Sequence, residues 1–322
     1  MRAVVTPTPQ VADMHVGIVA TPTPGPGQVL VRVHAAALNR ADLLQRRGLY
    51  PPPAGASQIL GLEVAGTVAQ TAANWSLGQR VMAVVTGGAY AEYVAVPAAE
   101  LLPIPELLSD SAAAAIPEAF LTAWLNLITL GGMKHGESVF IHAGASGVGS
   151  AALQLARAMG VDTYTAAGDE SKRAFCARLG ARLVRDSRAG EHAPAVREAT
   201  GGRGVDLVLD MLGAPAWEDN CAMLAQGGRL LLLGFLAGSK GTLDLGPILT
   251  RSLTVKGTTL RRTPAAAKAE LVSTAGAWLL PRFADGTLVP VVDRVYDLTD
   301  VAAAHQRMEA NQNIGKIILN LQ

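Results

Sequence analysis

The sequence predicts an α/β protein that combines a doubly wound parallel sheet with a β-rich unit. From about residue 138 onward, near-continuous apolar runs alternate with helical segments, which is typical of a parallel sheet buried on both faces. Before about residue 100, shorter apolar runs are punctuated by Pro and Gly, a pattern that favours a small barrel or sandwich. The chain has 322 residues, a length that corresponds to about two domains.

The elements of the β-rich unit follow from alternation and from turn residues. The valines at 29, 31 and 33 alternate with their neighbours, so this strand buries one face. Further strands are expected at 64–68, 80–85 and 91–96, one helix at 39–47 before Gly48, and another from Pro117 to Gly131-Gly132. After about residue 260 we expect a helix at 264–283, a strand at 289–295, a helix at 301–310 and a strand at 316–321. This tail is expected to return to the N-terminal unit.

The second half of the chain provides the strands of a complete doubly wound domain. They are expected at 138–142, 162–166, 182–185, 205–210, 228–234 and 253–258. Helices are expected between most of them, at 147–159, 170–179, 191–199 and 215–225. The link from 235 to 252 is expected to be a loop with a short helical turn.

A glycine-rich turn joins the first strand and helix of this sheet, and it reads Gly144-Ala145-Ser146-Gly147-Val148-Gly149. N–H groups at a helix start are unpaired, and the helix dipole is positive there, so a pyrophosphate binds well. Glycine lets the phosphates approach the backbone. The turn departs from G-x-G-x-x-G because Ser146 stands at the middle glycine. A glycine-rich stretch alone is weak evidence, because glycine is used in any tight turn. The flanking strand and helix are what favour a dinucleotide site here.

The end of the second strand favours NADPH over NADH. NAD enzymes carry an acidic residue there for the ribose hydroxyls, whereas this chain has Ala167 and Gly168. Gly168 leaves room for a 2′-phosphate, and Lys172 is placed to pair with it. Asp169 opposes this interpretation unless it caps the following helix, and Lys172 has the alternative of an exposed helix lysine.

Composition excludes several classes of protein. The net charge of +1 argues against nucleic acid or an anionic membrane as partner. Two cysteines, Cys176 and Cys221, exclude a disulfide framework and a four-cysteine zinc site, and we expect buried thiols. The densest apolar run, 230–237, is too short to span a bilayer, and the first residues do not read as a signal peptide. A cytoplasmic location is expected, with the arginine pairs at 46–47 and 261–262 as solvated surface.

Further motifs lie along nearly the whole chain: 38–53 (LNRADLLQRRGLYPPP), 59–66 (ILGLEVAG), 88–94 (GAYAEYV), 117–124 (PEAFLTAW), 233–235 (LGF), 243–247 (LDLGP) and 315–319 (GKIIL). Together with the glycine turn, they make the chain resemble the medium-chain dehydrogenase/reductase superfamily. The resemblance is strongest to its zinc-free NADPH:quinone oxidoreductases, particularly the group of the p53-inducible quinone oxidoreductase.

The resemblance implies a GroES-like catalytic domain at 1–120 and 260–322, and a Rossmann domain at 121–259. It implies hydride transfer from NADPH to a quinone without a metal. Zinc-dependent relatives would carry a cysteine at Asn39 and a histidine at Leu62, and Glu63 has no metal to serve here. It also implies a homodimer in which the strand at 253–258 pairs across the dimer axis.

The resemblance assigns the catalytic roles to Tyr50 and Asn39. A phenol or amide donor stabilises the charge that develops on a quinone oxygen, and Tyr50 could also deliver a proton. The alternatives are that Tyr50 is a packing residue of the turn before three prolines, and that Asn39 caps the helix at 39–47.

The resemblance also extends the cofactor site. Thr122 and Phe235 would flank the nicotinamide, and Asn313 would close over the cofactor. Ser187 stands where relatives often have a tyrosine beside the 2′-phosphate, and Arg185 and Arg188 flank it. The expected site is therefore Thr122, the turn from Gly144 to Gly149, Gly168, Lys172, Ser187, Phe235 and Asn313.

Two other functions stay open. A reductase of α,β-unsaturated carbonyls or enoyl thioesters would also place hydride on a conjugated acceptor, so the same site would serve. A cofactor-binding protein that acts as an RNA-binding or crystallin-like protein is the second, although the near-neutral charge and the absence of interleaved basic and aromatic residues speak against RNA.

Overall fold

The computed structural model describes residues 1–70 and 74–322. The chain forms two compact units. Unit 1 comprises Met1–Leu121 and Arg261–Gln322, and unit 2 comprises Thr122–Leu260. The boundary falls inside the helix that Pro117 begins.

Unit 1 is built on a mixed sheet in the order β14-β15-β3-β4-β5-β7, with β6 paired to β3. A separate hairpin pairs β1 with β2. The strands are β1 (Arg2–Val5), β2 (His15–Ile18), β3 (Gln28–Ala37), β4 (Glu63–Val68), β5 (Arg80–Val84), β6 (Tyr93–Pro97), β7 (Leu101–Pro103), β14 (Val292–Asp297) and β15 (Lys316–Asn320). Its helices are α1 (Arg40–Arg46), α2 (Asp110–Ala114), α3 (Pro117–Trp124), α9 (Ala265–Ala284) and α10 (Val301–Glu309), of which α3 continues into unit 2.

The ten-residue strand β3 organises this unit. Its first half pairs with β6 and its last three residues pair with β15, while β4 lies along the other edge. One strand thus serves two partners in succession, which bends the sheet as in a partly open barrel. The pairing of β15 with β3 confirms that the C-terminal tail returns to the N-terminal unit, and the GroES-like fold is confirmed.

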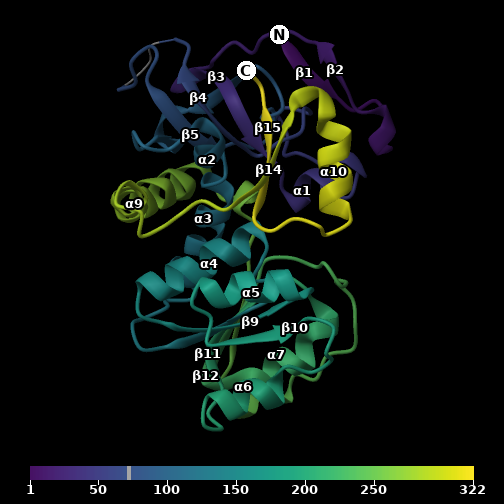
Figure 1. The fold of residues 1–322 in the computed structure, drawn as a ribbon, viewed down its shortest axis with the longest axis vertical. Coiled ribbons are helices and arrows are strands. Elements are labelled where there is room, and N and C mark those ends of the chain that lie inside the picture. The colour runs from purple at the N-terminus through teal and green to yellow at the C-terminus, as the bar shows by residue number, and fades with distance from the viewer. Residues whose placement is uncertain (71–73) are drawn as a thin grey trace. The chain divides into compact units, whose positions relative to one another are not determined.

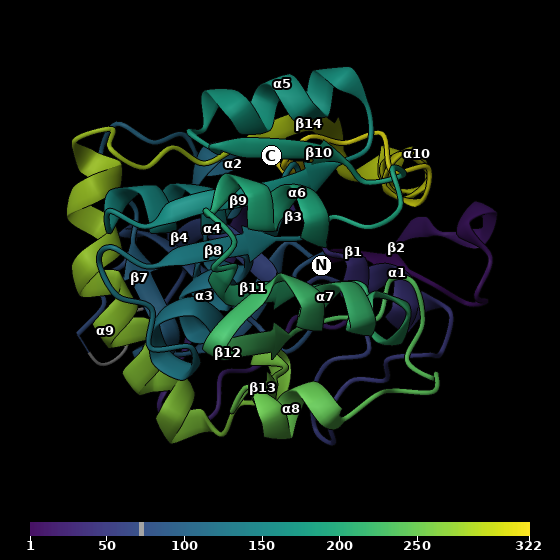
Figure 2. The same ribbon diagram turned by 90° about the horizontal axis from the view of Figure 1, so that it is seen from below.

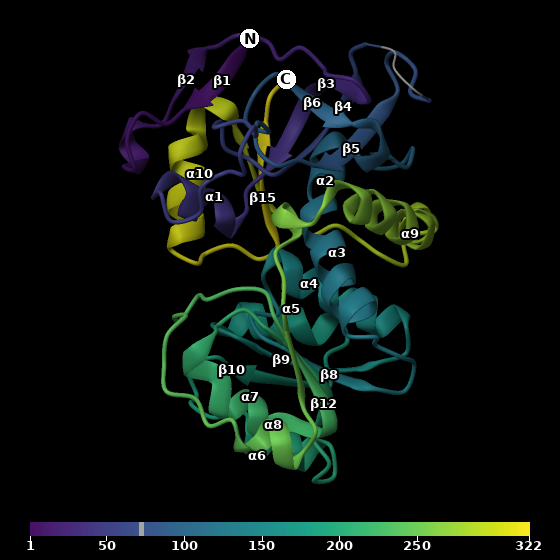
Figure 3. The same ribbon diagram turned by 180° about the vertical axis from the view of Figure 1, so that it is seen from behind.

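Unit 2 is an all-parallel sheet in the order β10-β9-β8-β11-β12-β13, which Figure 2 shows strand by strand. The strands are β8 (Ser138–Ile141), β9 (Asp162–Ala167), β10 (Leu183–Asp186), β11 (Val205–Asp210), β12 (Leu224–Leu232) and β13 (Thr254–Gly257). The helices are α4 (Gly147–Ala158), α5 (Glu170–Arg178), α6 (Ala193–Ala199), α7 (Trp217–Met223) and α8 (Gly246–Thr250). Helices α4 and α5 cover one face, and α6 and α7 cover the other (Figures 1 and 3). The predicted Rossmann fold is confirmed.

The helix that begins at Pro117 is less regular than predicted. It changes after Trp124 into a π-helix, Leu125–Leu130. The buried Asn126 side chain explains this, because its Nδ2 donates to the Thr122 carbonyl at 2.9 Å and competes for the oxygen that an α-helix gives to the Asn126 N–H. The helical run Asp110–Leu130 is long and apolar enough to cross a membrane, but 72% of its most apolar window is buried within the protein, as in a core helix.

Two expectations about individual side chains have opposite outcomes. Cys176 and Cys221 are both buried free thiols, as predicted. The expectation that residues 46–47 are solvated surface is wrong for Arg46. Helix α1 lies beside α10 (Figures 1 and 3), so the Arg46 guanidinium is buried in an ion pair with Glu309 and a contact of 3.1 Å to His305 Nδ1.

Candidate active site

The glycine turn after β8 leads directly into helix α4. Ser146 is the N-cap of α4, and its Oγ accepts the Gly149 N–H at 3.0 Å. A Cβ on Gly149 would lie 2.3 Å from the Ala143 carbonyl oxygen, so this glycine is required for strand and helix to approach. Ala143 itself adopts a left-handed conformation, with φ of 50°.

Two backbone donors of this turn are available to a ligand. In the part of the chain that the structure describes, the N–H groups of Gly147 and Val148 have no hydrogen-bond partner. Both residues are half-buried, whereas Gly144 and Ala145 are buried. Two N–H donors at the start of a twelve-residue helix fit a pyrophosphate. The turn therefore fits the phosphates of a dinucleotide.

The end of β9 is surrounded by cations. Arg173 and Arg188 each donate to the Gly168 carbonyl at 2.9 Å, and both bond to Asp186 at 3.0 Å. The side-chain and backbone hydrogen bonds of Arg188, with a smaller effect of the Arg173 charge, hold the pKa of the Asp186 carboxyl below its usual range. Ser187 is exposed, and its Oγ would lie 3.8 Å from a Cβ on Gly168. The space above Gly168 is therefore open and bordered by guanidinium groups.

The Asp169 carboxylate is engaged in capping the start of helix α5. It is the N-cap, and its side chain accepts the Lys172 N–H at 2.9 Å and the Ser171 hydroxyl at 2.6 Å. These bonds lower the pKa of the Asp169 carboxyl. The Lys172 Nζ lies 3.9 Å from Asp169 Oδ2, so both residues border the same corner as Gly168. Arg185, on β10, has a buried Nε without a partner among the described residues.

Thr122 and Phe235 occupy different environments within unit 2. Thr122 is buried, and its carbonyl accepts Asn126 Nδ2. Phe235 is 57% exposed and follows β12. A Cβ on Gly213, in the turn after β11, would lie 2.3 Å from the Gly238 carbonyl oxygen and 2.9 Å from the Phe235 ring, so only glycine lets these groups approach so closely.

Buried polar side chains lie at the carboxyl ends of strands β8 and β11. His142 Nε2 lies 2.6 Å from Asn220 Oδ1, and burial lowers the pKa of His142. Asp210 accepts the N–H groups of Leu212 at 2.7 Å and Gly213 at 3.2 Å, and burial raises the pKa of its carboxyl. These side chains hold the turn after β11 in place.

In unit 1, Asn39 lies in a buried cluster that the sequence does not reveal. Its Nδ2 donates to Glu63 Oε1 at 2.9 Å, and its Oδ1 accepts Lys316 Nζ at 2.6 Å. Lys316 Nζ also bonds to Glu63 Oε1 and to the Leu38 carbonyl, each at 2.6 Å. Both ends of the Asn39 amide are therefore held inside the protein.

Asp42 forms a second part of this cluster. Its carboxylate accepts the N–H groups of Asn39 at 2.7 Å and Gly61 at 3.0 Å, and the Tyr90 hydroxyl at 3.0 Å. Complete burial raises the pKa of Asp42 to about 6. The carboxyl thus ties helix α1 to the segment before β4.

Tyr50 lies against Arg261. The Arg261 guanidinium carbon is 5.3 Å from the centre of the Tyr50 ring, a cation–π contact. Arg261 also donates to the Thr86 carbonyl from Nε at 2.8 Å and from Nη2 at 2.5 Å. It is 6% exposed, so the expectation of solvated surface at 261–262 is wrong for Arg261. Chain segments distant in sequence enclose it.

Glu118 is a site residue to which the sequence assigns no role. Its N–H, in the first turn of α3, donates to Glu63 Oε2 at 2.9 Å. Burial and the neighbouring Glu63 charge raise the pKa of the Glu118 carboxyl to about 8. The available sequence signal is a carboxyl directly after Pro117, at the start of an apolar helix, in a motif otherwise made of apolar and small residues.

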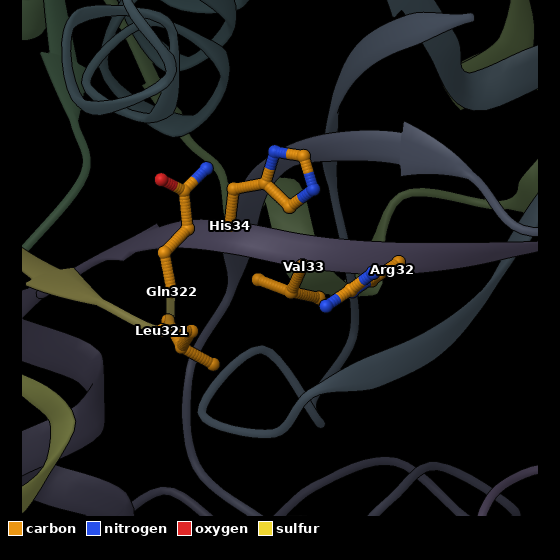
Figure 4. A pocket seen from close by; sticks show the side chains of 5 residues that line it. All are labelled: Arg32, Val33, His34, Leu321 and Gln322. Atoms are coloured by element: carbon orange, nitrogen blue, oxygen red, sulfur yellow. The ribbon is translucent and has the colours of Figure 1, made fainter. Parts of the chain in front are cut away.

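Asn313 precedes β15 and is half-buried. Its Nδ2 donates to the Gly315 carbonyl at 2.8 Å, so it shapes the turn that leads to Lys316. A shallow pocket of unit 1, drawn in Figure 4, is lined by Arg32, Val33, His34, Leu321 and Gln322. None of the predicted site residues lines that pocket.

The corner at Asn39 does not suit zinc. Among residues 1–70 and 74–322, no group of three or more His, Cys, Asp or Glu side chains is placed to hold a metal ion. An amide, one carboxylate and a lysine ammonium occupy this corner, whereas zinc selects thiolate, imidazole and carboxylate ligands.

Two family profiles match the chain. The alcohol dehydrogenase GroES-like domain matches residues 25–106, and the zinc-binding dehydrogenase family matches residues 147–275. The quinone oxidoreductase of Sus scrofa is 32% identical over 310 residues, which cover 94% of this chain and 92% of that protein. A phenolphthiocerol/phthiocerol polyketide synthase protein of Mycobacterium tuberculosis is 35% identical over 301 residues, or 91% of this chain. This chain spans only 14% of that synthase.

Solved structures share the whole fold. A mycobacterial protein in complex with NADPH has a TM-score of 0.89 at 30% identity, with both chains covered completely. An NAD-dependent alcohol dehydrogenase has a TM-score of 0.89 at 32% identity, also with both chains covered completely.

Proposed function

This chain belongs to the quinone oxidoreductase family of the medium-chain dehydrogenase/reductases, and from that premise we propose that it transfers hydride from NADPH to a quinone. The coarse class, an oxidoreductase, follows from the family. The observation that carries the proposal is the pair of N–H groups at Gly147 and Val148 that have no partner among the described residues, beside a strand end without a carboxylate. The nicotinamide supplies the hydride when it is bound, so the protein has to bind, orient and protonate.

The preference for NADPH over NADH is supported by the chemistry around Gly168. Asp169 is turned into the cap of α5, and Asp186 is paired with Arg173 and Arg188. Both carboxylates are thereby engaged, and Lys172 adds a further cation. Ser187 offers a hydroxyl where a phosphate oxygen would accept it.

The proposed acceptor site lies in unit 1. Tyr50 is our candidate to orient the acceptor oxygen, and the Arg261 charge above its ring favours the developing phenolate-like charge of a bound hydroquinone. Asn39 serves this site as a structural residue, because Glu63 and Lys316 occupy its amide. We infer that the reaction proceeds without zinc, since an amide, one carboxylate and a lysine ammonium occupy this corner rather than zinc ligands.

The experiment that tests the function is a screen of acceptors. Benzoquinones, naphthoquinones, enones and enoyl thioesters are each combined with NADPH and with NADH, and oxidation of the cofactor is followed by absorbance. We expect the highest kcat/KM for quinones with NADPH. Tyr50→Phe should lower the rate by roughly tenfold to a hundredfold if the hydroxyl orients the acceptor, and an unchanged rate would remove Tyr50 from the mechanism.

Reduction of enoyl thioesters is the alternative function. The 35% identity to a segment of a polyketide synthase favours it. Hydride addition to an enone or to a quinone leaves negative charge on a conjugated oxygen, so the same donors would serve. A kcat/KM for enoyl thioesters above that for every quinone would establish this alternative.

We also propose a cytoplasmic homodimer. Strand β13 is exposed along its whole length at the edge of the unit 2 sheet. Exposed apolar side chains accompany it, among them Leu245, Leu249 and Val255. An apolar edge strand is a template for pairing with a second copy. Light scattering of wild type and of Val255→Lys would test it, with a shift from dimer to monomer expected.

A further inference from the structure

We propose that Glu118 is the residue that delivers the proton to the reduced acceptor. The inference rests on the proposed function and deepens it, because it names a second catalytic group in addition to Tyr50. Tyr50 then orients the acceptor oxygen, and Glu118 supplies the proton that the hydride transfer requires.

The hydrogen bonding of Glu118 separates it from Asp42 and Glu63, the two carboxyl groups of the buried cluster. Asp42 and Glu63 are buried and accept several hydrogen bonds each. The Glu118 carboxyl belongs to a half-buried residue and has no hydrogen-bond or ion-pair partner among the described residues. Because no protein group of the described residues bonds to this half-buried carboxyl, Glu118 is the carboxyl among these three that can give its proton to a ligand.

The backbone fixes where this carboxyl lies. The Glu118 N–H donates to Glu63 Oε2, and Glu63 Oε1 is held by Lys316 and Asn39. The first turn of α3 is thus tied to the buried cluster. The position of Glu118 relative to Asn39 is set by two consecutive hydrogen bonds rather than by a mobile loop.

Burial, and after it the surrounding charges, keep the proton on Glu118. Glu63 and Asp42 oppose its ionisation, while Lys316 and Lys268 favour it. The Lys316 ammonium is 2.6 Å from Glu63, and the Lys268 ammonium is 3.8 Å from Glu100, so each cation is largely neutralised by a nearer carboxylate. The charge of Arg261 also acts on Glu118. Together with burial, this balance raises the pKa of Glu118 to about 8.

The proposed step balances in atoms and electrons. The acceptor receives a hydride, whose electron pair forms the new bond, while a π-electron pair of the acceptor moves onto its carbonyl oxygen. That oxygen forms an O–H bond with the Glu118 proton as the Glu118 O–H bond breaks. The acceptor is reduced by two electrons, NADPH is oxidised by two electrons, and the Glu118 carboxylate regains a proton from solvent.

Arg261 has a feature that suits the product of this step. Its Nη1 is buried without a hydrogen-bond partner among the described residues, although Nε and Nη2 bond to Thr86. The guanidinium therefore retains donor capacity close to the charge that forms when Glu118 loses its proton.

The first test needs no cofactor and no substrate. Infrared spectra of the free protein are recorded between about pH 6 and about pH 10, and the C=O stretch of protonated carboxyl groups is followed. We expect a band that is lost near pH 8 and that is absent from Glu118→Gln. Glu106→Gln, which alters an exposed glutamate of the same unit, is the matched control and should retain the band. A wild-type spectrum without such a band at neutral pH would overturn the inference.

The second test measures turnover with the best acceptor from the screen. In wild type, kcat should fall as pH rises above about 8, because only the protonated carboxyl is active. Glu118→Gln should lower kcat by roughly a hundredfold and remove this fall, while the Kd for NADPH, measured by fluorescence, stays unchanged. Glu118→Asp should restore part of the rate together with the pH dependence.

The outcomes distinguish the inference from the function on which it rests. A wild-type protein that turns over none of the acceptors would overturn the proposed function. Turnover by Glu118→Gln at the wild-type rate with the wild-type pH profile would overturn only the role of Glu118. If Glu118→Gln does not fold, the wild-type pH profile decides: a kcat that is constant from about pH 6 to about pH 10 overturns the inference.

Discussion

The glycine turn of unit 2 and the polar cluster of unit 1 are assembled in opposite ways. The turn is a continuous stretch from Gly144 to Gly149, and its functional groups are backbone N–H groups. The cluster joins side chains from four separate segments, and its hydrogen bond between Lys316 and Asn39 spans 277 residues of sequence.

This difference governs how each region responds to change. The donors of the turn are half-buried and close to solvent, whereas Glu63 and Lys316 are buried. Low dielectric strengthens every interaction in the cluster and makes an unpaired charge costly. Substitutions in the cluster should therefore act on stability, and substitutions in the turn and its surroundings should act on ligand affinity.

The largest effect is expected from Lys316→Met. This change leaves the buried Glu63 carboxylate without its cation, and breaking one side of a buried pair costs about 3–5 kcal/mol in the free energy of unfolding. Urea denaturation measures it. Lys240→Met, at an exposed lysine, is the control and should change stability by less than about 0.5 kcal/mol. Equal effects of the two substitutions would contradict the contrast between the regions.

The second prediction concerns Asp42 and pH. Burial raises the pKa of Asp42 to about 6, above the value of about 3.9 in an unfolded chain. Between about pH 4 and about pH 6 the folded state therefore binds a proton that the unfolded state has lost, so the free energy of unfolding falls as pH rises, by on the order of 3 kcal/mol.

Denaturant titrations of wild type and Asp42→Asn across this pH window measure the effect. The variant should lose this part of the pH dependence, although it is less stable at every pH because Asp42 accepts hydrogen bonds from Asn39, Gly61 and Tyr90. Parallel curves for the two proteins would show that Asp42 ionises as in the unfolded chain.

The third prediction tests the glycine turn. Gly149→Ala places a Cβ 2.3 Å from the Ala143 carbonyl oxygen, which forces strand and helix apart and costs about 1–3 kcal/mol of stability. Displacement of the α4 start should also weaken NADPH binding by roughly tenfold or more. Isothermal titration gives the Kd, and Gly25→Ala, where a Cβ meets only ordinary contacts, should bind as wild type does.

The smallest effect is expected from Lys172→Ala. Removal of one cation from the 2′-phosphate site should raise the Kd for NADPH by roughly tenfold, about 1.4 kcal/mol, and leave the Kd for NADH unchanged. The difference should shrink at high salt because dissolved ions screen the attraction between the lysine ammonium and the phosphate. A parallel loss of affinity for both cofactors would assign Lys172 a structural role instead.

The fold could be predicted from the sequence because the patterns that indicate it involve residues close together in the chain. Near-continuous apolar runs that alternate with helices predict the six parallel strands of unit 2, and turn residues place most boundaries within a few positions. The π-helix at Leu125–Leu130 is the exception. It depends on the Asn126 side chain, whose Oδ1 accepts the hydroxyl of Thr258, a residue distant in sequence. Helical periodicity does not reveal such a bond.

The surroundings of individual charged side chains were harder to predict from the sequence. Arg46 and Arg261 have neighbours in sequence that predict solvent exposure, yet contacts with Glu309 and Thr86 bury them. Asp169 shows the opposite, since its role as a helix cap depends on residues two and three positions away and is correctly expected from the sequence. The number of residues between two partners thus decides whether a contact can be predicted.

The sequence by itself determined the fold class, the glycine turn and the family, because strand and helix periodicity, glycine spacing and short motifs are properties of neighbouring residues. Only the tertiary structure decided which side chains share the buried corner with Asn39, which cation pairs with Glu63 and that the Glu118 carboxyl has no hydrogen-bond partner among the described residues. Burial removes solvent from groups that lie far apart along the chain, so their charges and protons are set by neighbours that only folding brings together.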